Sequence, residues 1–216
     1  MLDGDPERAV AYLQAAIKLN PTASEPHLKL ADALFMLQKF DQSVTECDTA
    51  LKLKPDQHRT LDIIYRRGCS YGGKNNFKLA IQDLDKVIAL APERNPVYRA
   101  RALVYRRSGN NKAAIADFQK FLAKAKEKDD IPATELACAQ CYRDIGDRVH
   151  ERVELTKVIK LSPDSIEAYR LRGDSFYKDS KFSQAMSDFA HVLELEPENE
   201  HCRNMLKSAN TKTRPK

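Results

Sequence analysis

Two cysteines three positions apart are the residues of this sequence best suited to bind a metal ion. They are Cys138 and Cys141, in the segment CAQC, and His150 follows nine residues after Cys141. Thiolates at this spacing are typical zinc ligands, but a zinc site needs a second such pair or a pair of histidines as well. The sequence has no second CxxC pair. We therefore predict that both cysteines are small buried groups on the packed face of a helix, with no metal or other cofactor.

Motifs that would support catalysis are missing from the sequence. There is no glycine-rich phosphate-binding loop, no GxSxG nucleophile turn and no HExxH zinc motif. We therefore predict a binding protein rather than an enzyme. The next question is which elements present its binding residues.

The composition indicates a well-ordered chain without a membrane span. The 216 residues are 31% charged and 42% hydrophobic, with a mean hydropathy of −0.57. No apolar run approaches the roughly 18 residues of a membrane-spanning helix, and the first residues lack the pattern of a secretory signal. Five cysteines at irregular spacing favour a reducing compartment over a disulfide scaffold. We expect an intracellular, cytoplasmic protein.

The net charge of +5 comes mostly from the C-terminal end. The last ten residues carry Lys207, Lys212, Arg214 and Lys216 and no acidic residue, which is +4 of the total. The rest of the chain is therefore nearly neutral. We expect its last six residues, TKTRPK, to form a disordered basic tail.

Prolines at regular intervals reveal an internal repeat. Each ends a similar phrase: AIKLNP, ALKLKP, VIALAP, VIKLSP or VLELEP. The prolines are Pro21, Pro55, Pro92, Pro163 and Pro197. A marker residue lies twelve positions before each of these prolines, and Ala114 is a sixth marker whose repeat has no closing proline. The markers are Ala9, Ser43, Ala80, Ala114, Glu151 and Ala185. The steps between the markers are 34, 37, 34, 37 and 34 residues. Three-residue extensions therefore lie near 58–60 and 129–131.

Each repeat has the pattern of two helices joined by a turn. The segment EPHLKLADALFMLQ carries apolar residues at helical spacing, and so does the segment DQSVTECDTALKLK that follows it. Nothing alternates with a period of two, so we predict an all-α chain. Glycines are expected in left-handed turns between the paired helices at Gly4, Gly109 and Gly146. A register of only small residues indicates close approach of the two helices: Ala31, Gly68, Ala102, Ala139 and Gly173.

A helix–turn–helix unit of 34 residues with a small residue, an aromatic residue three positions later and a closing proline resembles the tetratricopeptide repeat. The aromatic residues are Tyr71, Tyr105, Tyr142 and Phe176, with Leu34 in the same register. The resemblance covers almost the whole chain. It implies an all-α, right-handed superhelical solenoid of antiparallel helix pairs. Glu151 stands where the family expects alanine, so we expect its unit to be the loosest.

The resemblance also predicts the domain organisation. Five repeats are expected at 24–57, 61–94, 95–128, 132–165 and 166–199. Residues 1–23 would supply the second helix of an incomplete repeat, and residues 200–216 a capping helix with the basic tail. A single helix cannot bury its apolar face alone. We therefore expect the chain to be part of a longer protein or complex.

Three arginines are each followed by an aspartate sixteen residues later. The pairs are Arg67 with Asp83, Arg101 with Asp117 and Arg172 with Asp188. Because these arginines adjoin the register of small residues, we predict ion pairs between paired helices that fix register and do not bind ligand. Where the first position is Leu30 or Cys138, a glutamate replaces the aspartate, at Glu46 or Glu154.

In the family that this chain resembles, the first helices line a concave groove that binds peptides. The residues that this implies for the groove include six arginines: Arg66, Arg99, Arg106, Arg107, Arg143 and Arg170. Guanidinium groups bind carboxylates in bidentate fashion, so the groove would take an acidic peptide. The alternative is a solvated helix face, because charged runs are common on helix surfaces. The function predicted is a non-catalytic scaffold or adaptor that binds a peptide segment of a partner.

A carboxylate clamp for chaperone tails does not fit this sequence, since the matching pairs are Leu28 with Asp32, Tyr65 with Cys69, Pro96 with Ala100, and Leu136 with Gln140. Three alternative functions remain. An adaptor for chaperones without that clamp stays open. RNA binding, as in related helical repeats, is a second alternative, although regular base-reading pairs are missing. Self-association through the N-terminal half-unit is a third.

Overall fold

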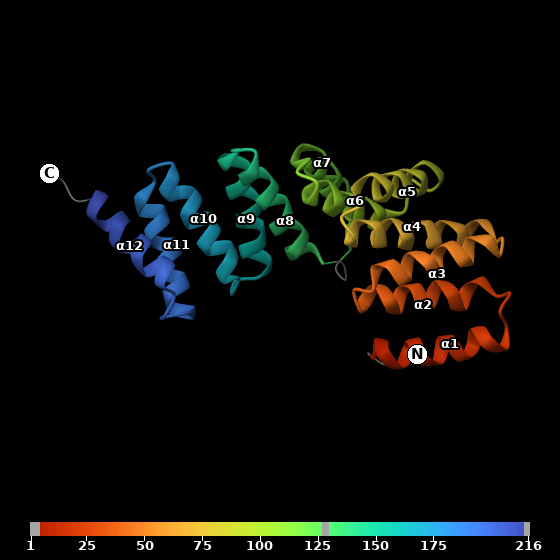
Figure 1. Cartoon of the computed structure of the whole chain (residues 1–216). Coiled ribbons are helices and arrows are strands. Elements are labelled where there is room, and N and C mark those ends of the chain that lie inside the picture. The colour runs from red at the N-terminus through yellow and green to blue at the C-terminus, as the bar shows by residue number, and fades with distance from the viewer. Residues whose placement is uncertain (1–4, 127–129, 214–216) are drawn as a thin grey trace. The chain divides into compact units, whose positions relative to one another are not determined.

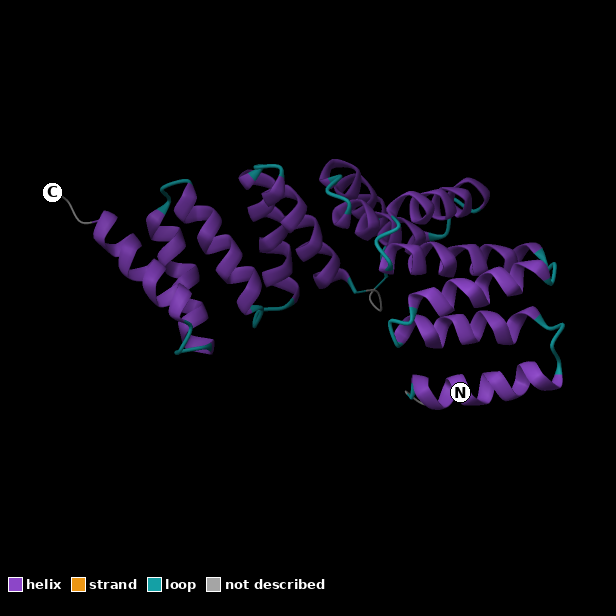
Figure 2. Cartoon of the chain, in the orientation of Figure 1, coloured by secondary structure: helices purple, strands orange, loops and turns teal. Residues whose placement is uncertain are grey.

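The computed structural model describes residues 5–126 and 130–213, and every regular element in them is a helix (Figures 1 and 2). The prediction of an all-α chain is confirmed for these residues. The helices are α1 (Pro6–Leu19), α2 (Ser24–Met36), α3 (Phe40–Lys52), α4 (Gln57–Gly73), α5 (Phe77–Leu90), α6 (Asn95–Arg107), α7 (Asn111–Leu122), α8 (Ile131–Asp144), α9 (Arg148–Leu161), α10 (Ile166–Lys178), α11 (Phe182–Leu195) and α12 (Glu200–Thr213). No helix in the described ranges is long and apolar enough to cross a membrane.

Contacts divide the chain into two compact units, Met1–Ala113 and Ala114–Lys216. In unit 1, α2 packs against α3 and α4 against α5, while α1, α3 and α5 each contact the helix that follows. In unit 2, α8 packs against α9 and α10 against α11, while α9 contacts α10 and α11 contacts α12. We call the even-numbered helices first helices and the odd-numbered ones second helices.

The register of small residues brings the paired helices close together, as predicted. Ala31, Ala102 and Ala139 are almost completely buried. A Cβ atom on Gly68 would lie 3.1 Å from Leu84 Cγ, and one on Gly173 would lie 2.7 Å from the Phe189 ring. The small residue therefore makes room for the second helix.

The turns inside the helix pairs use the left-handed conformation. Gly109 and Gly146 both have φ of 81°, which confirms the prediction for them, whereas Gly4 lies outside the described residues. The same turn position is left-handed without glycine at Gln38, Asn75 and Ser180. The turn geometry is thus set by the packing of the helices, since it persists where the residue is not glycine.

The extension near 58–60 lengthens a helix. α4 has 17 residues and begins at Gln57, about one turn before the predicted repeat limit at 61. The Asp56 carboxylate accepts a hydrogen bond from the Arg59 backbone at 2.9 Å and so caps the added turn. The extension near 129–131 is described only from residue 130 on, and α8 begins at Ile131.

The two terminal helices differ in burial. α1 has no fully buried residue. α12 packs Cys202 and Ala209 against α11 completely, with Met205 and Leu206 partly buried beside them, as the pattern predicts.

The prediction of a disordered tail is wrong for residues 211–213, which belong to α12. The hydroxyls of Thr211 and Thr213 donate to the carbonyls of Ser208 and Asn210 at 2.8 and 2.9 Å. Lys212 Nζ lies 5.0 Å from the centre of the Tyr177 ring, and this cation–π contact holds the last turn of α12 against α10. Residues 214–216 lie outside the described residues.

Candidate peptide-binding surface

Two of the predicted internal ion pairs are confirmed, each as a bidentate contact. Arg67 donates to both carboxylate oxygens of Asp83, at 2.8 and 2.9 Å. Arg172 donates to both oxygens of Asp188, at 2.9 and 2.7 Å. Because Asp83 and Asp188 are buried, these pairs lock the register of α4 with α5 and of α10 with α11.

The third predicted pair would join the two units and stays a prediction. Within its own unit, Arg101 donates to Asp85 at 2.5 Å, sixteen residues before it in the chain. The pairing of Arg101 with Asp117 is therefore not the basis of any argument below.

The two glutamates that replace the aspartates have unlike partners. Glu46 lies 2.7 Å from His27 Nδ1, on α2. Glu154 accepts a hydrogen bond from Lys157 at 2.7 Å and lies beside Glu135 on α8. Both glutamates of this second site are buried, so two carboxyl groups share one partly exposed lysine.

Glu135 is held in its neutral form by this environment. Burial and the adjacent Glu154 raise the pKa of Glu135 to about 8, and Lys157, whose Nζ lies 3.8 Å away, only partly opposes the shift. Its Oε2 atom is buried, and no group in the described part of the chain forms a hydrogen bond with it.

The six candidate groove arginines lie on first helices of both units. Four belong to α4 and α6 of unit 1, namely Arg66, Arg99, Arg106 and Arg107. Arg143 on α8 and Arg170 on α10 belong to unit 2. Each unit is described by itself below.

Unit 1 brings aromatic and basic groups together. Arg66 forms an ion pair with Asp32 of α2, and its guanidinium carbon lies 4.6 Å from the centre of the Phe35 ring. Burial raises the pKa of the Tyr65 hydroxyl, and the positive charges of Arg66 and Arg99 partly oppose that shift. Phe35, Tyr65, Arg66 and Arg99 therefore form one neighbouring group on three successive first helices.

Arg107 contacts the protein's own backbone. Its guanidinium donates to the Gly72 carbonyl at 2.9 Å and to Asn75 Oδ1 at 2.7 Å. These acceptors lie at the C-terminal end of α4, so Arg107 ties α6 to α4. A favourable interaction with the carbonyl end of a helix adds to this tie.

In unit 2 the two arginines have acidic neighbours. Arg170 Nη1 lies 3.7 Å from Asp174 Oδ2, and Asp174 is also hydrogen-bonded to His201 at 2.8 Å. Arg143 lies near the buried Glu151, whose pKa is raised by burial and partly lowered again by the arginine. Both arginines of unit 2 thus lie beside acidic groups, as Arg66 lies beside Asp32 in unit 1.

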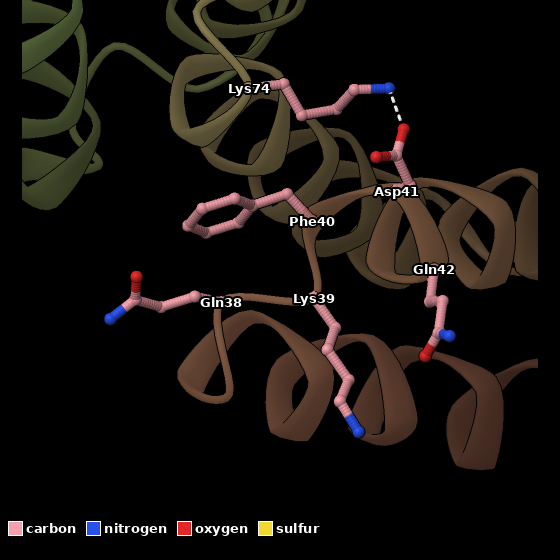
Figure 3. Close-up of a pocket in the computed structure, with 6 residues that line it drawn as sticks. All are labelled: Gln38, Lys39, Phe40, Asp41, Gln42 and Lys74. Atoms are coloured by element: carbon pink, nitrogen blue, oxygen red, sulfur yellow. Dashed lines mark ion pairs between the residues drawn. The ribbon is translucent and has the colours of Figure 1, made fainter.

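A shallow depression of about 430 Å³ lies at the turn ends of α2 and α4 (Figure 3). It is lined by Gln38, Lys39, Phe40, Asp41, Gln42 and Lys74. Lys74 and Asp41 form an ion pair across it. The Phe40 ring lies flat against Gly73, where an added Cβ would be 2.6 Å from the ring. It also meets Phe35 edge-on, with ring centres 5.4 Å apart. The depression thus adjoins the aromatic group of unit 1.

Comparison with known families gives the chain its class. Two models described as tetratricopeptide repeat match residues 1–61 and 65–129, together more than half of the sequence. The chain belongs to the tetratricopeptide repeat family. As such it is a helical-repeat scaffold for protein–protein interaction.

Curated relatives share the tetratricopeptide repeats over part of their length. Tetratricopeptide repeat protein 13 of Homo sapiens is 27% identical over 179 residues, which is 80% of this chain and 16% of the relative. Sperm-associated antigen 1 of Rattus norvegicus is 31% identical over 107 residues, which is 50% of this chain and 12% of the relative. The chain thus spans less than a fifth of these proteins.

Solved tetratricopeptide structures share the fold at low identity. YrrB, described as a protein with an unusual peptide-binding site, has a TM-score of 0.71 at 16% identity, with 90% of this chain and 97% of YrrB covered. PilF of Pseudomonas aeruginosa has a TM-score of 0.72 at 18% identity, with 95% and 90% covered. These likenesses show the fold.

Four of the five cysteines of this tetratricopeptide chain are buried in the core, and Cys69 is half-buried. Cys138 and Cys141 are completely buried on α8, as predicted, and burial raises the pKa of the Cys138 thiol. His150 instead stacks on Tyr142 and bonds to Asp147. All five cysteines are free thiols. Over residues 5–126 and 130–213, no group of three His, Cys, Asp or Glu residues is placed to hold a metal ion.

The sequence did not predict the charged contact between α9 and α10. We call the contact between a second helix and the next first helix a joint. Arg152 donates to Asp179 at 2.7 Å and to the Ser175 hydroxyl at 3.2 Å, and Arg148 donates to Asp179 at 2.6 Å. Arg152 and Glu151 are buried there. The pattern held a signal, because other tetratricopeptide units of this chain carry Phe40, Phe77 or Phe182 where α9 has Arg148. Glu151 therefore belongs to a polar network, and whether its unit is the loosest stays a prediction.

Proposed function

We propose that the chain is a non-catalytic, intracellular adaptor that binds an acidic peptide segment of a partner protein on its first helices. The proposal rests on one observation above all. In unit 1, Arg66 of α4 and Arg99 of α6 both lie near enough to Tyr65 to act on its pKa, and Phe35 lies against Arg66. Aromatic surface beside guanidinium groups suits a peptide that has both acidic and apolar side chains.

The arginines would have different roles in this site. Arg99 and Arg106 would contact the peptide in unit 1 together with Arg66, whose guanidinium is also paired with Asp32, and Arg143 and Arg170 would have the same role on the first helices of unit 2. Arg107 was predicted for the same surface. Because its guanidinium bonds the end of α4, we propose that it supports the groove and contributes less to peptide affinity.

Charge reversal tests the proposal. The probe is a fluorescein-labelled peptide of alternating Glu and Leu, measured by fluorescence anisotropy at low and high salt. We expect Arg99→Glu with Arg106→Glu to weaken binding by about tenfold or more and to leave the melting temperature nearly unchanged, since both side chains lie on a half-exposed face. Raising the salt should weaken the wild-type complex.

A matched control carries the same charge change elsewhere. Lys78→Glu with Lys86→Glu lies on the exposed face of α5, a second helix, and should leave affinity unchanged. An affinity that ignores both the arginine reversal and the salt concentration would contradict the proposal. Tighter binding of a single-stranded RNA oligonucleotide than of the peptide, lost in the same arginine variant, would favour RNA recognition instead.

A further inference from the structure

The exposed face of α9 has two valines at positions where the other second helices, as far as the structure describes them, have none. Val149 is 63% exposed and Val153 is 48% exposed. The equivalent positions of the other second helices are also exposed but hold charged, hydroxyl, amide or alanine side chains. They are Glu7, Asp41, Lys78, Lys112 and Ser183 at the first position, and Ala11, Thr45, Gln82, Ala116 and Ser187 at the second.

The cause is a displacement of the apolar pattern of α9 by one residue. Where most second helices turn apolar groups inward, α9 has Arg148 and Arg152, which bond to Asp179 of α10. The inward apolar residues elsewhere are Phe40, Phe77 and Phe182, and Val44, Ile81, Ile115 and Met186. The valines directly follow the two arginines, and therefore point outward. Asp179 pairs with the arginines inside the fold, but none of the described residues of unit 2 covers the valines.

The same exposed face continues with positive charge. Lys157 and Lys160 follow on it and are exposed, whereas the two carboxylates of the helix, Glu151 and Glu154, are both buried. Lys157 also bonds to the buried Glu154 at 2.7 Å, so Lys160 supplies most of the positive charge of this face. Val149 and Val153 are separated by about 6 Å along the helix axis, and Lys160 lies about 10 Å beyond Val153. The face thus offers an apolar half and a basic half, without an exposed carboxylate of α9.

We propose that this α9 strip, formed by Val149, Val153, Lys157 and Lys160, binds an acidic amphipathic helix of a partner protein. Two valines at i and i+4 match an apolar pair with the same spacing on a partner helix. Lys160, and to a smaller extent the paired Lys157, attracts carboxylates one to two turns further along, and α9 presents no exposed acid to repel them. Because the strip lies on a second helix, it is a different surface from the first-helix groove.

Synthetic helices test the strip directly on the full chain. Three fluorescein-labelled peptides are used: one with Leu at i and i+4 followed by Glu residues, one with Lys in place of those Glu residues, and one with Ser in place of Leu. We expect the acidic amphipathic peptide to bind at least about tenfold more tightly than the other two. Val149→Ser with Val153→Ser should weaken it about tenfold, and Lys160→Glu about threefold or more.

Controls separate the strip from the groove and from the fold. Lys78→Ser with Gln82→Ser changes the equivalent positions of α5 and should leave binding unchanged. The groove variant Arg99→Glu with Arg106→Glu serves as a second background, in which the groove no longer takes the acidic peptide and the strip variants should still weaken binding. The substituted side chains are exposed, so circular dichroism should show unchanged helicity, and Lys160→Glu removes no apolar contact. Equal binding of the acidic and basic peptides, or binding unaffected by both strip variants, would overturn the proposal. So would concentration-dependent self-association of the wild type that Val149→Ser with Val153→Ser abolishes, because a second copy would then cover the strip.

Discussion

The repeat of α2 and α3 and the repeat of α8 and α9 share one backbone plan but fill it with different chemistry. Inside the first, His27 bonds to Glu46 at 2.7 Å. Inside the second, the equivalent residues are Glu135 and Glu154, two buried carboxyl groups beside Lys157.

The contrast continues where each repeat meets the next first helix. Ser43 of α3 donates to the Ala31 carbonyl at 2.8 Å and lies 2.8 Å from the Ser70 hydroxyl of α4, next to the buried Val44. The equivalent residues of α9 are the buried Glu151 and Arg152. The fold therefore decides which positions are buried, while either apolar or charged groups can occupy them if the charged ones find partners.

The largest difference between the two repeats should appear as a pH dependence. The pKa of Glu135 is raised from 4.5 to about 8, so its neutral form stabilises the native state. This stability is fully present below about pH 4.5 and is lost as pH rises through 8, with a total of at most about 5 kcal/mol. Urea unfolding between pH 5 and pH 8.5 should show the decline in the wild type and a much smaller one in Glu135→Gln.

The control for this titration is Glu93→Gln, which removes an exposed carboxylate from a loop of unit 1. Its pH dependence should follow the wild type. If the free energy of unfolding of Glu135→Gln falls with pH in parallel with that of the wild type, ionisation of Glu135 is not the cause of the decline. The buried pair in α8 and α9 would then tolerate charge as well as His27 with Glu46.

Removing the carboxylate of the α9–α10 joint should have the next largest effect. Asp179→Ala leaves the buried Arg152 without its ion pair, and we expect a loss of about 3 kcal/mol in the free energy of unfolding. The matched change is Asp41→Ala, which removes the exposed partner of Lys74 at the equivalent joint and should cost at most about 0.5 kcal/mol. Hydrogen exchange of α9 and α10 would locate the loss, and equal costs of the two variants would contradict the contrast between the joints.

The hydroxyl contact at the α3–α4 joint should give the smallest effect. Ser43→Ala removes its bond to the Ala31 carbonyl and should cost about 1 kcal/mol. Ser70 can still donate to the Arg66 carbonyl, 3.0 Å away, so no donor is stranded. Thermal unfolding of Ser43→Ala beside the exposed Ser187→Ala measures the difference. A cost as large as that of Asp179→Ala would mean that this joint depends on polar contacts as strongly as the other one.

Periodic features of the chain could be predicted from the sequence because the residues that form them occur in several repeats. Helix pairs, the close approach at Gly68 and Gly173, and the ion pairs of Arg67 and Arg172 all recur at the repeat spacing. The N-terminal extension of α4 could be placed along the chain but not given a shape, since three added residues fit a loop as well as a helical turn. The six candidate groove arginines were placed on first helices by their position in the repeat, but their partners could not be predicted.

The all-α repeat fold, the repeat period and the helix pairs could be predicted from the sequence alone, because burial in a solenoid follows the spacing of small and apolar residues. Where a residue departs from the repeat pattern, its contacts follow from the tertiary structure. It pairs Arg66 with Asp32, turns Arg107 onto the end of α4 and joins Arg152 to Asp179. Each of these contacts joins different repeats, and the direction and reach of a long side chain depend on how neighbouring helices pack rather than on its position in the period.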